Sequence, residues 1–254
     1  MNFRRLRALM QKEWREMFKN KMVLLSVIIA PLILLSISVF LLVVFNNTYG
    51  DFIAEEEILV QLQGDWAILL NNILMFFMFM PLVIPLAIAV YSVVGEKEQK
   101  SLEPLLATPL TDLELFLGKA LASVLPGLLI TWLSFGIFSG MLIYLIPWSF
   151  INLFFKPPWL MAMFGLAPII SVFSVLSAMA ISSFTRDTRA AYQLSSLIMI
   201  PFLMGSLYYI FTFQGLVSMQ FVFLSMAVMG GMDVLMLFLG MRLFRREDIL
   251  TRWN

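Results

Sequence analysis

Long stretches without a single charged residue divide the 254-residue chain, and they constrain it more than any other feature. A membrane-spanning helix needs about 20 consecutive, mostly apolar residues. Four of these stretches are long enough, and we assign one span to each of them. The sequence therefore predicts membrane helices at residues 22–45, 67–94, 120–146 and 159–184.

A fifth stretch runs from 190 to 241 and contains one charged residue, Asp233. As a single helix it would be about 78 Å long at 1.5 Å per residue, whereas the hydrocarbon core of a bilayer is about 30 Å thick. It must therefore fold back, and the segment 212–220 suits such a turn best. This gives two further spans, at 190–211 and 221–241.

The basic residues test this division, because they accumulate on the cytoplasmic side of membrane proteins. Of the 17 lysines and arginines, all except Lys156 lie in four segments that alternate along the chain. Six spans place these segments on one side, whereas five spans would place the C-terminal arginines on the other. We therefore expect a multi-pass protein of the plasma membrane with both termini in the cytoplasm. The four basic segments are 1–21, 95–119, 185–189 and 242–254.

The composition agrees with this fold and removes several classes of function. Hydrophobic residues make up 61% of the chain and charged residues 13%, and there is neither histidine nor cysteine. Apolar residues make up only about half of a soluble domain, and the usual zinc, haem and thiol sites need histidine or cysteine. We expect an all-α fold in a single membrane domain over residues 1–254, with no catalytic residue, metal or cofactor of its own.

The first 21 residues combine apolar and basic side chains at helical spacing. Such a helix lies in the headgroup region of a bilayer, here with Trp14 at the interface. We therefore expect an amphipathic interfacial helix at 1–21, and a plain basic flank of the first span is the alternative. Its apolar residues are Phe3, Leu6, Leu9, Met10, Trp14, Met17 and Phe18, and its basic residues are Arg4, Arg5, Arg7, Lys12, Arg15 and Lys19.

The polar loop 95–119 has the local signals of two short helices joined by a turn. Ser101 is a good N-cap for the first helix, and Pro109 pushes the preceding Thr108 out of the helical region. Thr111 and Glu114 have the spacing of a capping box, which predicts the beginning of the second helix.

Leu102, Leu105 and Leu106 give the first of these short helices an apolar face. A capped helix with such a face, held between two spans, suits a groove on a partner protein. The alternative is a solvated loop whose leucines merely rest on the membrane, and the physical pattern alone leaves both open.

Several short motifs follow one another in this loop. They are Glu96-Lys97-Glu98, Ser101-Leu102-Glu103, Leu105-Leu106, Thr108-Pro109-Leu110 and Leu117-Gly118-Lys119. In this order they closely resemble the E-(R/K)-E, (S/T)-L-E-x-L-L-x-(T/S)-P and L-x-G-K pattern of exporter-type permease subunits of ATP-binding-cassette (ABC) transporters. Gln99 and Lys100 depart from the pattern, because many members have a glycine before the Ser or Thr. The N-terminal helix, the six spans, the second loop at 185–189 and the ending at 244–253 are also similar to this family.

The resemblance implies a half-channel that pairs with a second permease copy or a paralogue and with two soluble ATPase subunits. It also implies export of a substrate that the sequence does not identify. The helix at 101–107 would be the coupling helix that docks in the ATPase, with Glu96 and Glu98 at its entry. The residues assigned to this coupling are Glu96, Glu98, Ser101, Leu102, Glu103, Leu105, Leu106, Thr108 and Pro109.

ATP binding is expected on a partner chain, because this chain lacks a phosphate-binding loop of the form G-x-x-x-x-G-K-(S/T). Gly118 and Lys119 are followed by Ala120, and Asp112 and Leu113 stand where a preceding glycine would be needed. We therefore expect a transport subunit that is not an enzyme and that has no nucleic-acid partner.

Asp233 is the one charge expected deep inside a span, at about 13 Å of helix rise from Arg242. An aspartate at such a depth usually faces the bundle or a cavity. Two roles are open: a place in the pathway or in ion or proton binding, and a structural hydrogen bond to a neighbouring span. An ion-coupled carrier ordinarily needs more than one such group. The ion-coupled carrier and a non-transporting membrane anchor are both kept as alternatives to the permease.

Overall fold

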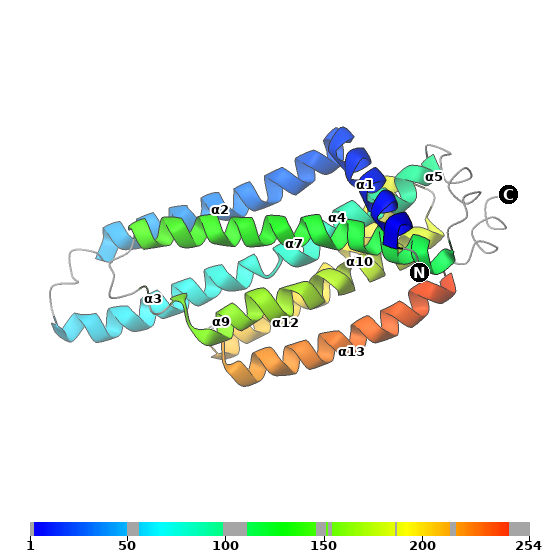
Figure 1. Cartoon of the computed structure of the whole chain (residues 1–254). Coiled ribbons are helices and arrows are strands. Elements are labelled where there is room, and N and C mark those ends of the chain that lie inside the picture. The colour runs from blue at the N-terminus through cyan, green and yellow to red at the C-terminus, as the bar shows by residue number, and fades with distance from the viewer. Residues whose placement is uncertain are drawn as a thin grey trace.

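The computed structural model is helical wherever it has regular structure. Its long helices run side by side along one axis (Figure 1). No strand occurs among the residues that it describes, which are 3–49, 56–98, 111–145, 151, 154–185, 187–213 and 217–243.

Six helical segments are long and apolar enough to cross a membrane. They confirm the predicted all-α, polytopic fold. Some of them extend past the predicted limits, since the second segment already begins at Gly64 and the third at Asp112. The six segments are Val23–Thr48, Gly64–Glu98, Asp112–Leu145, Pro157–Phe184, Thr188–Tyr209 and Met219–Met241.

The first, third and sixth spans are single helices, whereas the other three are built from several helical elements. Two of these elements, η2 and η3, are π-helices. In chain order the elements are α1 (Phe3–Lys19), α2 (Lys21–Tyr49), α3 (Glu56–Phe77), α4 (Met80–Val90), η2 (Tyr91–Gly95), α5 (Glu96–Glu98), α7 (Asp112–Leu145), α9 (Pro157–Met161), η3 (Ala162–Leu166), α10 (Ala167–Phe184), α11 (Thr188–Ser196), α12 (Met199–Phe213) and α13 (Met219–Leu243).

The beginning of α7 explains why the third span is longer than predicted. The backbone N–H of Glu114 donates to Thr111 Oγ1, and the N–H of Thr111 donates to Glu114 Oε2, both at 3.2 Å. This reciprocal pair of bonds is the predicted capping box. The helix therefore begins at Asp112 and continues without interruption into the span.

α10 lies in the interior of the bundle, where it packs against α4, α7 and α13. Its small residues Ala167, Ser174 and Ala178 are completely buried. α4 and α7 also approach each other closely, because a Cβ atom on Gly127 would lie 2.4 Å from Cγ of Pro85. Small residues thus allow the spans to pack at short distance, as is usual in membranes.

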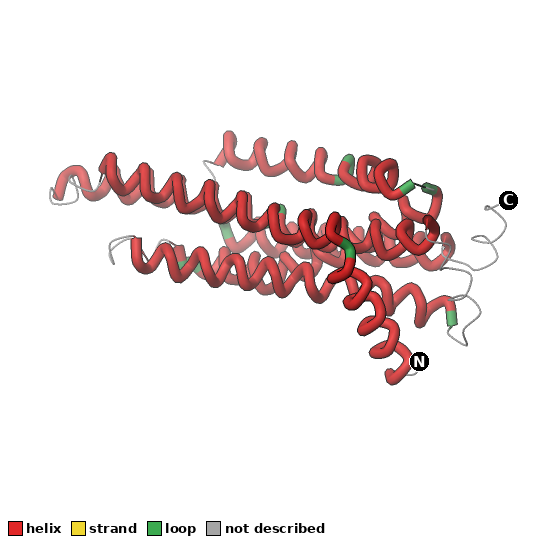
Figure 2. Tube along the Cα trace, turned by 90° about the horizontal axis from the view of Figure 1, so that it is seen from above, coloured by secondary structure: helices red, strands yellow, loops and turns green. Residues whose placement is uncertain are grey.

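α1 crosses the end of the bundle obliquely instead of continuing the direction of α2 (Figures 1 and 2). The predicted helix is present, and its position in the headgroup region stays a prediction. Leu6 and Leu9 are buried and lie over Gly118 of α7. Trp14 Nε1 donates a hydrogen bond to the carbonyl oxygen of Ala122 at 3.0 Å. The apolar side of α1 therefore packs mainly on protein, because the beginning of α7 offers it a complementary apolar surface.

One end of the bundle gathers several chain segments that are far apart in sequence. The beginning of α1, the end of α5, the beginning of α7 and the end of α13 all lie there (Figure 1). These are the ends that the distribution of basic residues assigns to one side of the membrane.

Candidate functional site

A cluster of buried charges lies where α1, the second span and α7 meet. Lys119 of α7 is fully buried, and Glu13 of α1 and Glu96 of α5 are only 6% and 4% exposed. Glu13 follows Leu6 and Leu9 at helical spacing, so the same face of α1 carries all three side chains toward α7. Because buried charges are costly unless they are paired, the pairing in this cluster determines whether it is stable.

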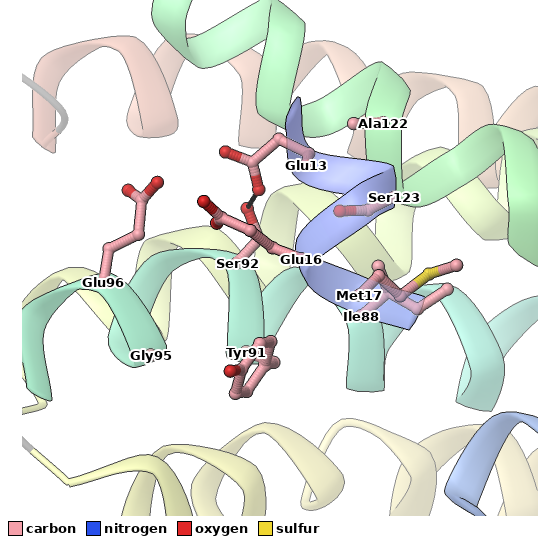
Figure 3. Close-up of a pocket in the computed structure, with 10 residues that line it drawn as sticks. All are labelled: Glu13, Glu16, Met17, Ile88, Tyr91, Ser92, Gly95, Glu96, Ala122 and Ser123. Carbon is pink, nitrogen blue, oxygen red and sulfur yellow. Dashed lines mark hydrogen bonds between the residues drawn. The ribbon is translucent and has the colours of Figure 1, made fainter. Parts of the chain in front are cut away.

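Lys119 is paired on several sides. Its Nζ lies 2.7 Å from Glu96 Oε2 and 2.9 Å from Glu13 Oε1. It also donates to the carbonyl oxygen of Ser92 at 2.8 Å and to Ser92 Oγ at 3.2 Å. Ser92 Oγ in turn donates to Glu13 Oε2 at 2.6 Å, the dashed line in Figure 3. One ammonium group therefore joins three segments of the chain.

Lys12 extends the cluster toward the surface. It forms a hydrogen-bonded ion pair with Glu96, and its Nζ lies 3.1 Å from Glu16 Oε2 and 3.6 Å from Glu13 Oε1. Burial opposes the charge of Lys12, but the hydrogen bonds to Glu96 and Glu16 and the negative charges of Glu96 and Glu13 together outweigh burial. The pKa of Lys12 is therefore raised above its ordinary value.

Glu13 is affected in the opposite direction. Burial alone would raise the pKa of its carboxyl group, but the charges of Lys119 and Lys12 and the hydrogen bonds from Ser92 and Lys119 together outweigh burial. The pKa of Glu13 is therefore lowered from its ordinary value. Glu13 and Lys12 are both ionised at neutral pH, which keeps the cluster charged.

Three carboxylates of the cluster, those of Glu13, Glu16 and Glu96, lie within 4.8 Å of one another. Carboxylate oxygens are the ligands that hard divalent cations prefer. Here the ammonium groups of Lys12 and Lys119 already pair with these carboxylates, and the cavity beside them measures only about 20 Å³. The donor set therefore suits the two lysines better than a metal ion.

Lys97 binds the end of the fourth span. Its Nζ donates to the carbonyl oxygens of Ser182, Ser183 and Thr185 at 2.6, 3.0 and 3.2 Å. These carbonyl groups lie at the C-terminal end of α10, where a cation satisfies free acceptors and complements the helix dipole. Lys97 thereby fixes α5 to the end of α10.

Glu98 makes the corresponding contact with the next helix. Its Oε1 accepts a hydrogen bond from the backbone N–H of Thr188, the first residue of α11, at 2.7 Å. Asp187 caps the same helix, because its Oδ2 accepts from the N–H of Ala190 at 3.1 Å. Acidic groups are favoured at a helix N-terminus, so Glu98 and Asp187 together stabilise the beginning of α11.

The motif Glu96-Lys97-Glu98 is thus a junction between four elements. Glu96 forms ion pairs with α1 and α7. Lys97 donates hydrogen bonds to the end of α10, and Glu98 accepts one from the beginning of α11. The sequence places Glu96 and Glu98 at the entry of the loop but does not reveal their partners. One signal was available, since Glu13 falls on the apolar side of the helical pattern in 1–21, where an acid needs a partner.

The remaining predicted coupling residues lie outside the described residues. They are Ser101, Leu102, Glu103, Leu105, Leu106, Thr108 and Pro109. Both flanks of this segment are described, since the chain is defined up to Glu98 and again from Thr111. The docking role of the segment stays a prediction.

Asp233 lies in α13, which packs against α10. Its Oδ1 atom is buried and finds no hydrogen-bond partner in the part of the chain that the structure describes. The structural hydrogen bond considered from the sequence is therefore not formed at this oxygen. A role of Asp233 in the pathway stays a prediction.

One known family matches most of the chain. It is described as "ABC-2 family transporter protein", and the match covers residues 7–220. The chain belongs to the ABC-2 family. The matched region includes Glu13, the Glu96-Lys97-Glu98 motif and Lys119. A comparison with individually curated proteins gives no match.

As an ABC-2 protein with six membrane helices, the chain is a multi-pass permease component of an ABC transporter. It is a membrane transport subunit and is not itself catalytic, and membership implies association with ABC ATPase subunits. The permease family that the loop motifs indicated is thereby confirmed.

Proposed function

We propose that this ABC-2 permease forms half of an export pathway, and that two separate ATPase subunits drive it through the loop between α5 and α7. A second copy or a paralogue completes the pathway. The end of the bundle that carries the loop faces the cytoplasm, and the spans cross the plasma membrane. ATP binds to the partner subunits, so this chain needs no cofactor of its own.

The observation that supports this proposal best is the direct pair between Glu96 and Lys119. Glu96 precedes the loop and Lys119 follows it, and their charged groups are 2.7 Å apart in a buried site. Breaking a buried pair by removing one partner typically costs about 3–5 kcal/mol. A displacement of the loop is therefore transmitted to the second span, to α7 and, through Glu13, to α1.

The contacts of Lys97 and Glu98 extend the same displacement to the junction of α10 and α11. α10 packs against three other spans, so a shift at its end alters the arrangement of the bundle. ATP binding biases the membrane domain only if the ATPase contacts its two states differently. A junction of four elements gives such differential contacts a direct mechanical route to the spans.

Replacing Leu105 and Leu106 by aspartate tests this proposal. The tagged full chain is purified from its own membranes, and copurified proteins and ATP hydrolysis are measured. We expect an ATPase subunit with the wild-type chain, and loss of both the subunit and its hydrolysis with Leu105→Asp/Leu106→Asp, because unpaired charges oppose the burial of an apolar face.

Ala8→Asp is the control, because it adds a negative charge at an exposed position of α1. It should copurify with the ATPase as the wild type does. The proposal is wrong if no protein with a phosphate-binding loop accompanies the wild-type chain, or if the double variant retains normal binding and hydrolysis.

A further inference from the structure

A groove opens between the second, fourth, fifth and sixth spans. Its volume is about 350 Å³, within the range of roughly 300–1,000 Å³ that small-molecule sites occupy. Met78, Ile170, Phe202 and Val222 each line it from a different span. It shares no lining residue with the charge cluster.

The lining of the groove offers apolar contact and little else. Among the described residues no charged side chain lines it, and Ser206 and Ser225 supply its hydroxyl groups. Ser206 Oγ already donates to the carbonyl oxygen of Leu203 at 2.8 Å within α12. Flexible methionines such as Met75 and Met229 adapt to ligands of irregular shape. The enclosed part of a ligand must therefore be apolar and uncharged.

Three of the four spans depart from a regular α-helix beside the groove. α3 gives way to α4 at Met78 and Phe79, and the fourth span contains the π-helix η3. The fifth span is interrupted between α11 and α12, just before Pro201. In a bilayer, irregular backbone occurs where it is buried in protein or lines a cavity, and π-helices and discontinuous helices often mark functional sites. Three such departures around one groove indicate a binding site.

The surroundings of the groove determine what can enter it. α12 and α13 are membrane helices, and Met204 and Leu224 on them are 63% and 64% exposed. Leu224 also belongs to the lining. The hydrocarbon chains of the bilayer therefore reach the groove laterally, without passing through water.

We propose that this groove binds an acyl chain of a lipid amphiphile drawn from the bilayer, and that lipid amphiphiles are the substrate class of the transporter. The polar headgroup stays outside, because the lining has no charged group to receive it. The assignment of the substrate class rests on the proposed export function, whereas the binding of the chain does not.

Gly205 provides the variant that tests the groove. It lines the groove, and a Cβ atom built on it meets no atom within 4 Å. Gly205→Phe therefore places a ring in the groove without a clash at its Cβ atom. Gly136 of α7 is the matched control, since it has the same open space and does not line the groove.

The measurement is photolabelling of the purified full-length complex in phosphatidylcholine vesicles. A trace phospholipid carries a photoactivatable diazirine in its acyl chain, and labelled residues are identified by mass spectrometry. We expect label on lining residues such as Met78 and Met229. Gly205→Phe should reduce this label by about tenfold, which corresponds to about 1.4 kcal/mol, whereas Gly136→Phe should not change it.

Equal labelling of the groove in Gly205→Phe and wild type would overturn the proposal that the groove binds an acyl chain. An unlabelled groove in the wild type would do the same, and it would indicate that another protein surface, such as a second copy of the chain, covers the groove.

Adding ATP to the complex distinguishes binding of the lipid in the groove from its transport. With the ATPase present, turnover should lower the label in the groove relative to the nucleotide-free complex. Label that persists unchanged during turnover would mean a resident lipid and would overturn the substrate class. If no ATPase copurifies, the export function fails, while photolabelling of the permease alone still decides whether the groove binds acyl chains.

Discussion

Lys119 is held by four oxygen atoms, two from the side chains of Glu13 and Glu96 and two from Ser92. A lysine ammonium group has three donors and no acceptor, so this surrounding satisfies it completely. The arrangement replaces the water that the buried charge has lost. It also makes Lys119 the residue on which the other buried charges depend.

Replacing Lys119 by methionine should therefore damage the protein more than the loss of one charge at the surface. Lys119→Met removes the fully buried partner of Glu13 and Glu96 and leaves only the partly exposed Lys12 beside them, and we expect a loss of about 3–5 kcal/mol of stability. Thermal unfolding of the purified permease in detergent measures this loss. Lys19→Met, at an exposed position of α1, should leave the midpoint within the range of ordinary surface changes, about 0.5 kcal/mol. Equal midpoints for the two variants would contradict the role given to the buried pair.

The sequence could identify the members of this cluster only in part. Glu96 and Glu98 stand in a recognisable motif, and Lys119 ends another. Their partners could not be inferred, because Glu13 is 106 positions from Lys119 along the chain, and Ser92 is 27. No local spacing rule links such residues, and only the packing of α1 on α7 brings them together.

Among the helices, the contact of α4 with α7 depends on the absence of a side chain. A Cβ atom on Gly127 would lie 2.4 Å from the ring of Pro85, so Gly127→Val should push the two helices apart. We expect a loss of about 1–3 kcal/mol, the usual cost of overpacking, measured as a lower midpoint of thermal unfolding. Gly136→Val is the control, because nothing lies within 4 Å of a Cβ atom there. A normal midpoint for Gly127→Val would show that the spans are packed more loosely than the structure indicates.

The six spans could be predicted because absence of charge over about 20 residues is a strong signal. The capping box at Thr111 was also predictable, since it depends on two residues three positions apart. The interruption at Met78 lies just before Pro81 and η3 lies just before Pro168, and a proline removes one backbone N–H from a helix. The π-helix η2 was not predicted, because hydropathy averages over such local changes.

In the whole molecule, the Glu96-Lys97-Glu98 junction and the groove lie toward opposite ends of the spans, and α10 connects them. Lys97 binds the carbonyl group of Ser182 near the end of α10, whereas Ile170 lines the groove. These two positions are separated by about 18 Å of helix rise. α10 therefore gives the proposed coupling a direct route from the loop to the groove.

The orientation of the whole molecule can be tested directly, because the chain contains no cysteine. A single Ala8→Cys substitution in α1 should react with a membrane-impermeant thiol reagent only after the cells are permeabilised. Lys156→Cys, between the third and fourth spans, should react in intact cells, since basic residues collect on the opposite side. Labelling of Ala8→Cys from outside would reverse the assigned topology.

Glu96, Lys97 and Glu98 occupy three consecutive helical positions, and their side chains contact partners that lie in different directions. Each added residue turns an α-helix by about 100°. Inserting or deleting one residue immediately before Glu96 would therefore rotate all three side chains away from their partners at once, whereas a substitution removes one contact at a time. Evolution can vary the chemistry of this short segment more easily than its length, and homologues should differ here by replacement and not by insertion.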